Sequence, residues 1–139
     1  CEPVELHLID PWLYLPEFGN TGFGRKKNEF KMEERYHDVV AAFKDDARVK
    51  IHRATSQEAL ARLPDNTLDW VYIDVNDDLA ACLKKVRNNG IITGDDYNWQ
   101  SAASGAPVRR AVEAMLEELG PEKAKLSLMA NQYIIELNL

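Results

Sequence analysis

The sequence predicts an α/β fold with a doubly wound, mostly parallel sheet that ends in a C-terminal pair of antiparallel strands. Short apolar segments alternate along the chain with segments whose apolar residues recur at helical spacing. This alternation is typical of parallel strands that are covered by helices on both faces of the sheet. The chain has 139 residues, a length that suits one core, so residues 1–139 are predicted to form a single domain.

Six segments are predicted as strands. The first, residues 4–9, stops at Asp10 and Pro11, and the third, residues 68–74, has the composition of a buried strand. The last two strands surround a turn at Ala130 and Asn131, and so short a turn forces an antiparallel pair. The predicted strands are residues 4–9, 48–53, 68–74, 90–94, Ala124–Met129 and Gln132–Leu137.

Four helices are predicted between these strands. Residues 55–58 read Thr-Ser-Gln-Glu, a capping box that opens the second helix, which ends near Pro64. Pro107 starts the fourth helix, and Gly120 with Pro121 stops it. The apolar positions of the helices are Tyr36, Val39, Val40 and Phe43 in the first, Leu79, Cys82, Leu83 and Val86 in the third, and Val108, Ala111, Val112, Met115, Leu116 and Leu119 in the fourth.

Composition excludes several classes of protein. The net charge is -6 and the pI is about 5.1, which argues against a nucleic-acid-binding protein, because that function needs a basic surface. No apolar run approaches the roughly 20 residues of a membrane span. Cys1 and Cys82 make no disulfide framework, so a reducing, cytoplasmic setting is expected. Residues 19–27, rich in glycine and basic side chains, are predicted to be a loop with few core contacts.

Acidic residues follow three of the predicted parallel strands. Asp10 follows the first strand, Asp74 the third, and Asp95 with Asp96 the fourth. The carboxyl ends of parallel strands meet at one rim of the sheet, where ligands bind in such folds. Asp10 at that rim suits either the two hydroxyls of a ribose or a local loop cap.

The three acids after the third and fourth strands also suit a metal ion. Asp74, Asp95 and Asp96 would supply the oxygen ligands that magnesium prefers. The alternative is that a single carboxylate binds a ligand and that the others are solvated. No two of the three histidines, His7, His37 and His52, have metal-ligand spacing in the sequence, so each is interpreted as structural.

The segments "ELHLIDPW", "LDWVYID", "GIITGDDYNW" and "NQYIIEL" together resemble class I S-adenosylmethionine-dependent methyltransferases, which have a Rossmann-like fold. The nearest branch is the small-molecule O-methyltransferases with "IDG-D-H" and "GG-DDY" motifs. The resemblance implies that S-adenosylmethionine is the cofactor and that Asp74 and Asp96 are catalytic. It further implies cofactor contacts at Asp10, Trp12, Thr55, Ser56 and Asp74, and a magnesium ion at Asp74, Asp95 and Asp96.

The sequence also departs from this family. The family's first strand and glycine-rich loop have no counterpart before Cys1, so the chain is expected to be truncated at its N-terminus. The family's "IDG-D-H" motif reads "IDVNDD" in this sequence, with Val75 in place of glycine and no histidine. Because the family's first strand lies mid-sheet, a slot about one strand wide, with neighbours about 9.5 Å apart, is expected between residues 4–9 and 68–74. A segment outside this sequence or a partner chain would fill that slot.

These observations lead to one functional hypothesis and two alternatives. The hypothesis is methyl transfer from S-adenosylmethionine to a hydroxyl of a small molecule such as a sugar, assisted by magnesium. A small-molecule acceptor and a second copy of the chain are the expected partners. The first alternative is a non-catalytic scaffold that keeps the methyltransferase fold for protein contacts. The second is a nucleotide-sugar or dinucleotide enzyme that uses the same rim.

Overall fold

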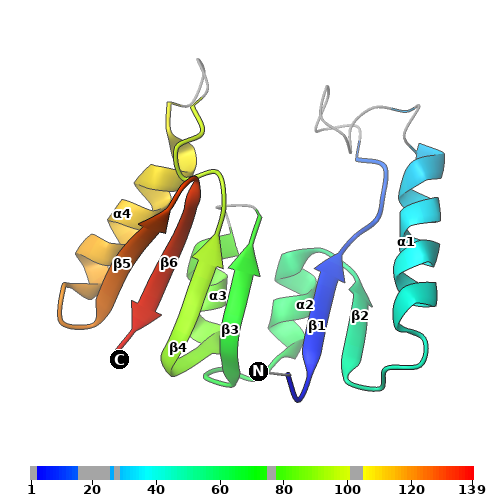
Figure 1. Ribbon diagram of the computed structural model, residues 1–139, viewed down its shortest axis with the longest axis horizontal. Helices are drawn as coiled ribbons and strands as arrows, with labels where there is room; N and C mark the ends of the chain where they lie inside the picture. The colour runs from blue at the N-terminus through cyan, green and yellow to red at the C-terminus, as the bar shows by residue number, and fades with distance from the viewer. Residues whose placement is uncertain (1–2, 16–25, 27–28, 75–77, 101–104) are drawn as a thin grey trace. The chain divides into compact units, whose positions relative to one another are not determined.

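The structure is a computed structural model of the 139-residue chain, in which residues 3–15, 26, 29–74, 78–100 and 105–139 are described. It confirms an α/β chain: among the described residues, strands and helices alternate from β1 to α4, and strands β5 and β6 follow (Figure 1). The chain divides into two compact units, Cys1–Ala59 and Leu60–Leu139. Of the predicted loop at residues 19–27, only Lys26 belongs to the described residues, and it is exposed. None of the described helices is both long and apolar enough to span a membrane.

The first unit is built on two parallel strands. Strand β1 (Leu6–Asp10) pairs with β2 (Val49–Arg53), so that Asp10 lies opposite Arg53 at the carboxyl ends of both strands. Helix α1 (Glu29–Phe43) connects them, and α2 (Ser56–Arg62) begins after β2. The guanidinium of Arg53 lies 4.4 Å from the ring centre of Tyr36 on α1 and is paired with Glu33 of the same helix. These contacts attach α1 to the carboxyl end of β2.

The predicted capping box is confirmed at the start of α2. The Glu58 amide donates to the Thr55 hydroxyl at 3.3 Å, and the Thr55 amide donates to the Glu58 carboxylate at 3.0 Å. Each side chain therefore satisfies an amide that the helix cannot pair internally. The box fixes where the chain leaves β2 and where α2 begins.

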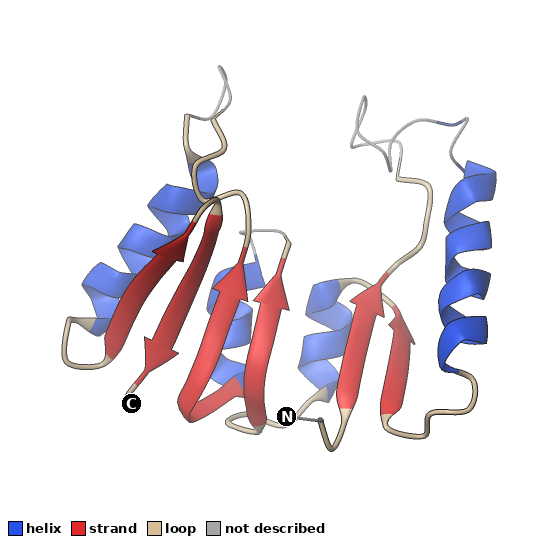
Figure 2. Cartoon of the chain, viewed as in Figure 1, coloured by secondary structure: helices blue, strands red, loops and turns tan. Residues whose placement is uncertain are grey.

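The second unit contains a four-stranded mixed sheet (Figure 2). Its strand order is β3 (Leu68–Ile73), β4 (Val86–Gly94), β6 (Gln132–Leu137) and β5 (Ala124–Met129). Strands β3 and β4 are parallel, whereas β6 is antiparallel to both β4 and β5. The predicted C-terminal antiparallel pair is therefore confirmed.

One face of this sheet forms the core of the second unit. Helices α3 (Leu79–Lys85) and α4 (Pro107–Leu119) lie on the same side of the sheet (Figure 1). Alternate strand residues point toward them, as the two-residue period of a strand requires. The buried core residues include Ile73, Ile92, Tyr133, Ile135 and Leu137 from the strands and Leu79, Cys82, Val108, Val112 and Met115 from the helices.

Two boundaries differ from the sequence prediction by more than one residue. Strand β1 begins at Leu6 rather than at Val4, whose side chain is 92% exposed. Val86, predicted on the apolar stripe of the third helix, is instead the fully buried first residue of β4. It pairs with Leu68, and the register then shifts so that the regular ladder resumes at Ile91. Helical spacing alone could not show that the chain passes from α3 into a strand without a loop.

The hydrogen bonding of β1 and β3 bears on the expected slot in the sheet. Among the described residues, β1 pairs only with β2, and β3 is an edge strand that pairs only with β4. The slot is expected between strands that belong to different units, and it stays a prediction. The width of the slot and the group that fills it stay predictions.

Candidate functional site

The carboxyl ends of β3 and β4 bring three acidic residues into electrostatic contact. Asp74 follows β3, and Asp95 and Asp96 follow β4. Burial, the negative charge of Asp95 and, to a smaller extent, that of Asp74 raise the pKa of Asp96 above its usual value. Burial and the charge of Asp95 likewise raise the pKa of the Tyr72 phenol. The rim is therefore a locally negative surface with a phenol beside the acids.

Asp96 has an unusual backbone conformation. Its φ is 58°, in the left-handed region that residues other than glycine rarely adopt. The Trp99 amide donates to the Asp96 carbonyl at 2.9 Å, which closes a tight turn directly after β4. Such conformations persist where the surrounding contacts fix them, and they are concentrated at functional sites.

The contacts that fix this turn come from Asn131, between β5 and β6. Asn131 accepts from the Tyr97 amide through its carbonyl and from the Asn98 amide through Oδ1, both at 2.9 Å. Its Nδ2 donates to Asp96 Oδ1 at 3.2 Å. Sequence reasoning assigned Asn131 to a turn and missed its contact with Asp96, because the two are 35 residues apart.

A second missed residue, Arg109, supports the same segment from α4. Its Nη2 donates to Asn98 Oδ1 at 2.6 Å, and its guanidinium lies 5.3 Å from the ring centre of Tyr97. Arg109 Nε is a buried atom with no partner among the described residues. The position of Arg109 in the first turn of a helix that follows the rim was the only signal of this role in the sequence.

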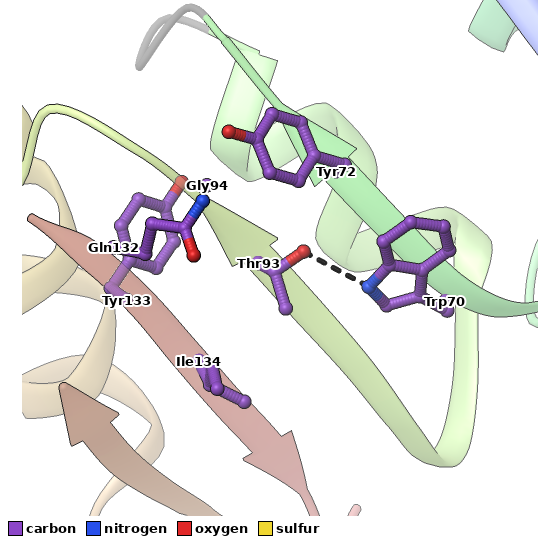
Figure 3. Close-up of a pocket in the computed structure, with 7 residues that line it drawn as sticks. All are labelled: Trp70, Tyr72, Thr93, Gly94, Gln132, Tyr133 and Ile134. Carbon is purple, nitrogen blue, oxygen red and sulfur yellow. Dashed lines mark hydrogen bonds between the residues drawn. The ribbon is translucent and has the colours of Figure 1, made fainter. Parts of the chain in front are cut away.

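A shallow depression of about 230 Å³ lies next to the rim, on the face of the sheet opposite α3 and α4 (Figure 3). Trp70 and Tyr72 of β3 form one wall, and the Trp70 Nε1 donates to the Thr93 hydroxyl at 2.9 Å. Both aromatic side chains are about half exposed, at 52% and 48%. The remaining lining residues are Gly94, Gln132, Tyr133 and Ile134.

The predicted magnesium site does not match the side chains as they are placed. Among the described residues, no group of three His, Cys, Asp or Glu side chains is arranged to hold one metal ion. Magnesium needs near-octahedral oxygen geometry at about 2.1 Å, which is a demanding requirement. The charges of Asp95 and Asp74 raise the pKa of Asp96, but the three carboxylates do not form a ready-made cation site.

In the first unit, Asp10 ends β1 beside a residue with a strained backbone. Its Oδ1 accepts a hydrogen bond from the amide of Trp12, whose φ is 42°. The Trp12 carbonyl in turn accepts from Arg53 Nη2 at 3.4 Å. Asp10 therefore acts as a local loop cap, one of the two roles expected, and this contact also fixes the direction of its carboxylate. Its role toward a ribose stays a prediction.

Thr55 and Ser56, predicted to meet an adenine, lie at the start of α2. The Thr55 hydroxyl donates to Glu58 Oε2 at 2.9 Å in addition to its capping contact. The Thr55 side chain is therefore engaged within the helix terminus, whereas Ser56 is partly buried in its first turn.

The structure also pairs two of the histidines. His7 Nδ1 lies 2.8 Å from His52 Nε2, the rings stack with centres 5.1 Å apart, and His7 Nε2 lies 2.9 Å from Glu5. The third, His37, pairs with Glu33 one turn earlier on α1 at 3.2 Å. These contacts are consistent with the structural interpretation of the histidines.

The sequence of this chain is similar to that of a known protein family. A family model described as a methyltransferase domain matches residues 2–97, which is more than half of the chain. No curated protein matches the sequence significantly.

Several solved structures share the fold. The O-methyltransferase NovP superimposes with a TM-score of 0.67 at 17% identity, over 97% of this chain and 60% of that one. The SAH-bound methyltransferase PaMTH1 from Podospora anserina gives a TM-score of 0.56 at 17% identity, over 78% of this chain and 57% of that one. The SAH-bound O-methyltransferase from Bacillus cereus gives a TM-score of 0.51 at 15% identity, over 78% of this chain and 59% of that one.

The chain thus spans about three fifths of the length of these structures. At these identities the structural similarity establishes the fold alone, and the family model establishes the family. The matched residues run from before β1 to the turn after β4 and so include every residue of the predicted site. The chain therefore belongs to the family of methyltransferase domains and has their Rossmann-like α/β fold.

Proposed function

We propose that the protein to which this chain belongs transfers a methyl group from S-adenosylmethionine to a hydroxyl of a small molecule. The observation that carries the proposal is the family match over residues 2–97, which contains all the strand ends where the predicted site residues lie. Because the chain spans about three fifths of the similar structures, the activity is proposed for the whole protein. The small acidic domain, with a net charge of -6, favours a small acceptor over a nucleic acid.

Asp10 is the residue proposed to hold the cofactor ribose. A carboxylate at the end of a parallel strand can accept hydrogen bonds from both ribose hydroxyls. The Trp12 amide occupies one lone pair of Oδ1 and fixes the carboxylate orientation. Ser56 and the backbone of Thr55, at the N-terminus of α2, are proposed to meet the adenine.

The acids after β3 and β4 are proposed to act on the acceptor. S-adenosylmethionine, when bound, would supply the methyl group of its sulfonium by in-line displacement, and the remainder of the cofactor would leave as S-adenosylhomocysteine. Asp96 would hold the acceptor hydroxyl and take its proton as the new C–O bond forms. Asp74 would hold the acceptor or the methionine end of the cofactor. Positioning of the two reactants supplies most of the rate in such a reaction.

A magnesium ion is proposed separately, because neither the proton transfer to Asp96 nor the methyl transfer depends on it. Asp74, Asp95 and Asp96 would be its ligands, but their side chains are not arranged as a metal site among the described residues. The test is methyl transfer by the full-length protein in excess EDTA. Loss of turnover that magnesium alone restores would support the ion, and unchanged turnover would exclude it. The predicted homo-oligomer and cytoplasmic location also stay predictions.

The proposed function is tested by ligand binding and by turnover in the full-length protein. We expect isothermal titration to detect S-adenosylhomocysteine, and Asp10→Ala to weaken its affinity about tenfold or more, because a charged hydrogen-bond partner is lost. Asp45→Ala is the matched control, since Asp45 is exposed and makes only a 3.9 Å ion pair with Lys44. Release of S-adenosylhomocysteine from S-adenosylmethionine is then measured with catechol and with a methyl glucoside as probe acceptors.

The scaffold alternative gives a different result in the same experiment. One observation favours it: the "IDVNDD" segment lacks the family's glycine and histidine. A scaffold would bind no S-adenosylhomocysteine at millimolar concentration. That outcome would overturn the proposed function.

A further inference from the structure

We infer that Asn131, in the turn between β5 and β6, is the residue that positions the Asp96 carboxylate for catalysis. The inference rests on the proposed function, in which Asp96 acts on the acceptor. Asn131 contributes to this role through contacts that no sequence pattern indicates. It is a positioning residue, because it acts through Asp96 and is assigned no contact with substrate.

Asn131 holds three consecutive residues after β4. Its backbone carbonyl accepts from the Tyr97 amide, and its Oδ1 accepts from the Asn98 amide, each at 2.9 Å. Its Nδ2 donates to Asp96 Oδ1 at 3.2 Å. The neighbouring Ala130 carbonyl accepts from Asn98 Nδ2 at 3.2 Å. The turn between β5 and β6 thus makes four hydrogen bonds to one short segment of the rim.

The direction of the Asn131 side chain follows from these contacts. The Asn98 amide is a donor, so the atom that faces it must be the acceptor Oδ1. The Nδ2 group of Asn131 must then face the Asp96 carboxylate, which is an acceptor. Only asparagine offers an acceptor and a donor in this fork at this length. An aspartate would keep the contact to Asn98 and place a negative charge against Asp96.

The need for such a contact arises from the backbone of Asp96. Its φ of 58° is sterically unfavourable for a residue with a side chain. Strained conformations of this kind persist only where neighbouring structure fixes them. Arg109 fixes the far end of the segment through its 2.6 Å bond to Asn98 Oδ1. Asn131 fixes the near end of the segment and donates a hydrogen bond to the Asp96 carboxylate, the group that the proposed reaction uses.

The experiment uses four variants of the full-length protein, one of which is Asp96→Asn alone. Asn131→Asp keeps an acceptor for the Asn98 amide and removes the donor to Asp96. The double variant Asp96→Asn with Asn131→Asp restores a donor–acceptor pair with the roles exchanged. Asn138→Asp is the matched control, because Asn138 makes the same kind of contact, to the Glu122 carbonyl at 3.4 Å, away from the rim.

The first measurement is a double-mutant cycle of urea unfolding, which needs no acceptor. We expect Asn131→Asp to raise the unfolding equilibrium constant about threefold or more, and the exchanged pair to recover most of that loss. The Asn138→Asp control should change it by less. Additive effects of Asp96→Asn and Asn131→Asp would show that the two side chains are not coupled, and would overturn the inference whatever the activity.

The second measurement separates positioning from a merely structural role. With S-adenosylmethionine and whichever probe acceptor is turned over, we expect Asn131→Asp to lower kcat about tenfold or more. The KM for S-adenosylmethionine and the affinity for S-adenosylhomocysteine should stay within about twofold, because Asp96 is assigned to the acceptor. A kcat within twofold of the wild type would overturn the inference. A wild type that binds no S-adenosylhomocysteine overturns the proposed function and the positioning role together, whatever the cycle shows.

Discussion

At the scale of single residues, Asp46 shows how one carboxylate can hold the start of a strand. Its Oδ1 accepts from the Arg48 amide at 3.1 Å and from Arg48 Nε at 2.9 Å, and its Oδ2 accepts from Nη2 at 2.7 Å. These hydrogen bonds, with the Arg48 charge, lower the pKa of Asp46 to about 2. The contact fixes the chain just before Val49, where β2 begins.

The lowered pKa of Asp46 gives a pH-dependent prediction. A carboxylate with a folded-state pKa of about 2, below its usual 3.8, stabilises the fold at every pH above 3.8. This contribution is lost as the pH falls from 3.8 toward 2, where the folded state also becomes protonated. We therefore expect Asp46→Asn to lower the free energy of unfolding near neutral pH and to have little effect near pH 2.

The measurement is urea unfolding of both proteins between pH 2 and pH 7. Asp45→Asn is the control, since the Asp45 side chain is solvent-exposed and its ion pair with Lys44 is long, at 3.9 Å. A difference between wild type and Asp46→Asn that stayed constant down to pH 2 would show that the Arg48 contact does not depend on the Asp46 charge.

At the scale of the elements, the end of β4 depends on a residue without a side chain. A Cβ at Gly94 would lie 2.4 Å from the Tyr133 hydroxyl and 2.5 Å from the Ile73 carbonyl oxygen. Gly94 pairs with Ile73 of β3 on one side and with Tyr133 of β6 on the other. The close approach lets Tyr133, which is 1% exposed, pack over the end of β4 directly before Asp95.

Gly94→Ala is therefore expected to destabilise the second unit. The Ile73 oxygen belongs to a strand backbone and cannot move away without disturbing the β3–β4 ladder. Overpacking of this kind costs about 1–3 kcal/mol, which denaturant unfolding can measure. Adding Tyr133→Phe removes the clash with the hydroxyl but not the clash with Ile73, so it should recover at most part of the loss. A fully stable Gly94→Ala protein would show that β3 and β4 do not approach this closely.

At the scale of the whole molecule, the two units have very different cores. Among the described residues, the buried apolar side chains of the first unit are Met32, Ala54 and Ala59. The second unit buries Tyr133, Ile92, Ile135, Val86 and Val112 almost completely. Its inner strands β4 and β6 each have two hydrogen-bonded neighbours, whereas β1 and β2 have one each among the described residues.

This difference predicts unequal local stability in the 139-residue chain on its own. A two-stranded sheet is marginally stable at best without further packing, and local opening follows the density of buried apolar contacts. We expect the amides of Ile92 and Ile135 to exchange with deuterium at least about tenfold more slowly than those of Leu8 and Ile51. Native-state hydrogen exchange measures this. Equal protection in both sheets would mean that they open only together, as a single folding domain.

The sequence by itself determined the order and type of the elements. Alternating periodicity predicted all six strands and four helices, because burial against a core imposes a two-residue period on strands and a 3.6-residue period on helices. Local chemistry predicted the Thr55–Glu58 capping box and the Pro107 helix start, since both depend on neighbouring residues. The acids after β3 and β4 were found because strand direction alone places them at one end of the sheet.

Only the tertiary structure decided how those acids are held. Asn131 and Arg109 reach the segment after β4 from positions 35 and 11 residues away along the chain, and no local pattern encodes such contacts. The direct passage from α3 into β4 at Val86 is also set by pairing with Leu68, a partner distant in sequence. Periodicity reports which face of an element is buried. The partner that buries it, and the side chain that orients a carboxylate at the rim, depend on packing between distant segments.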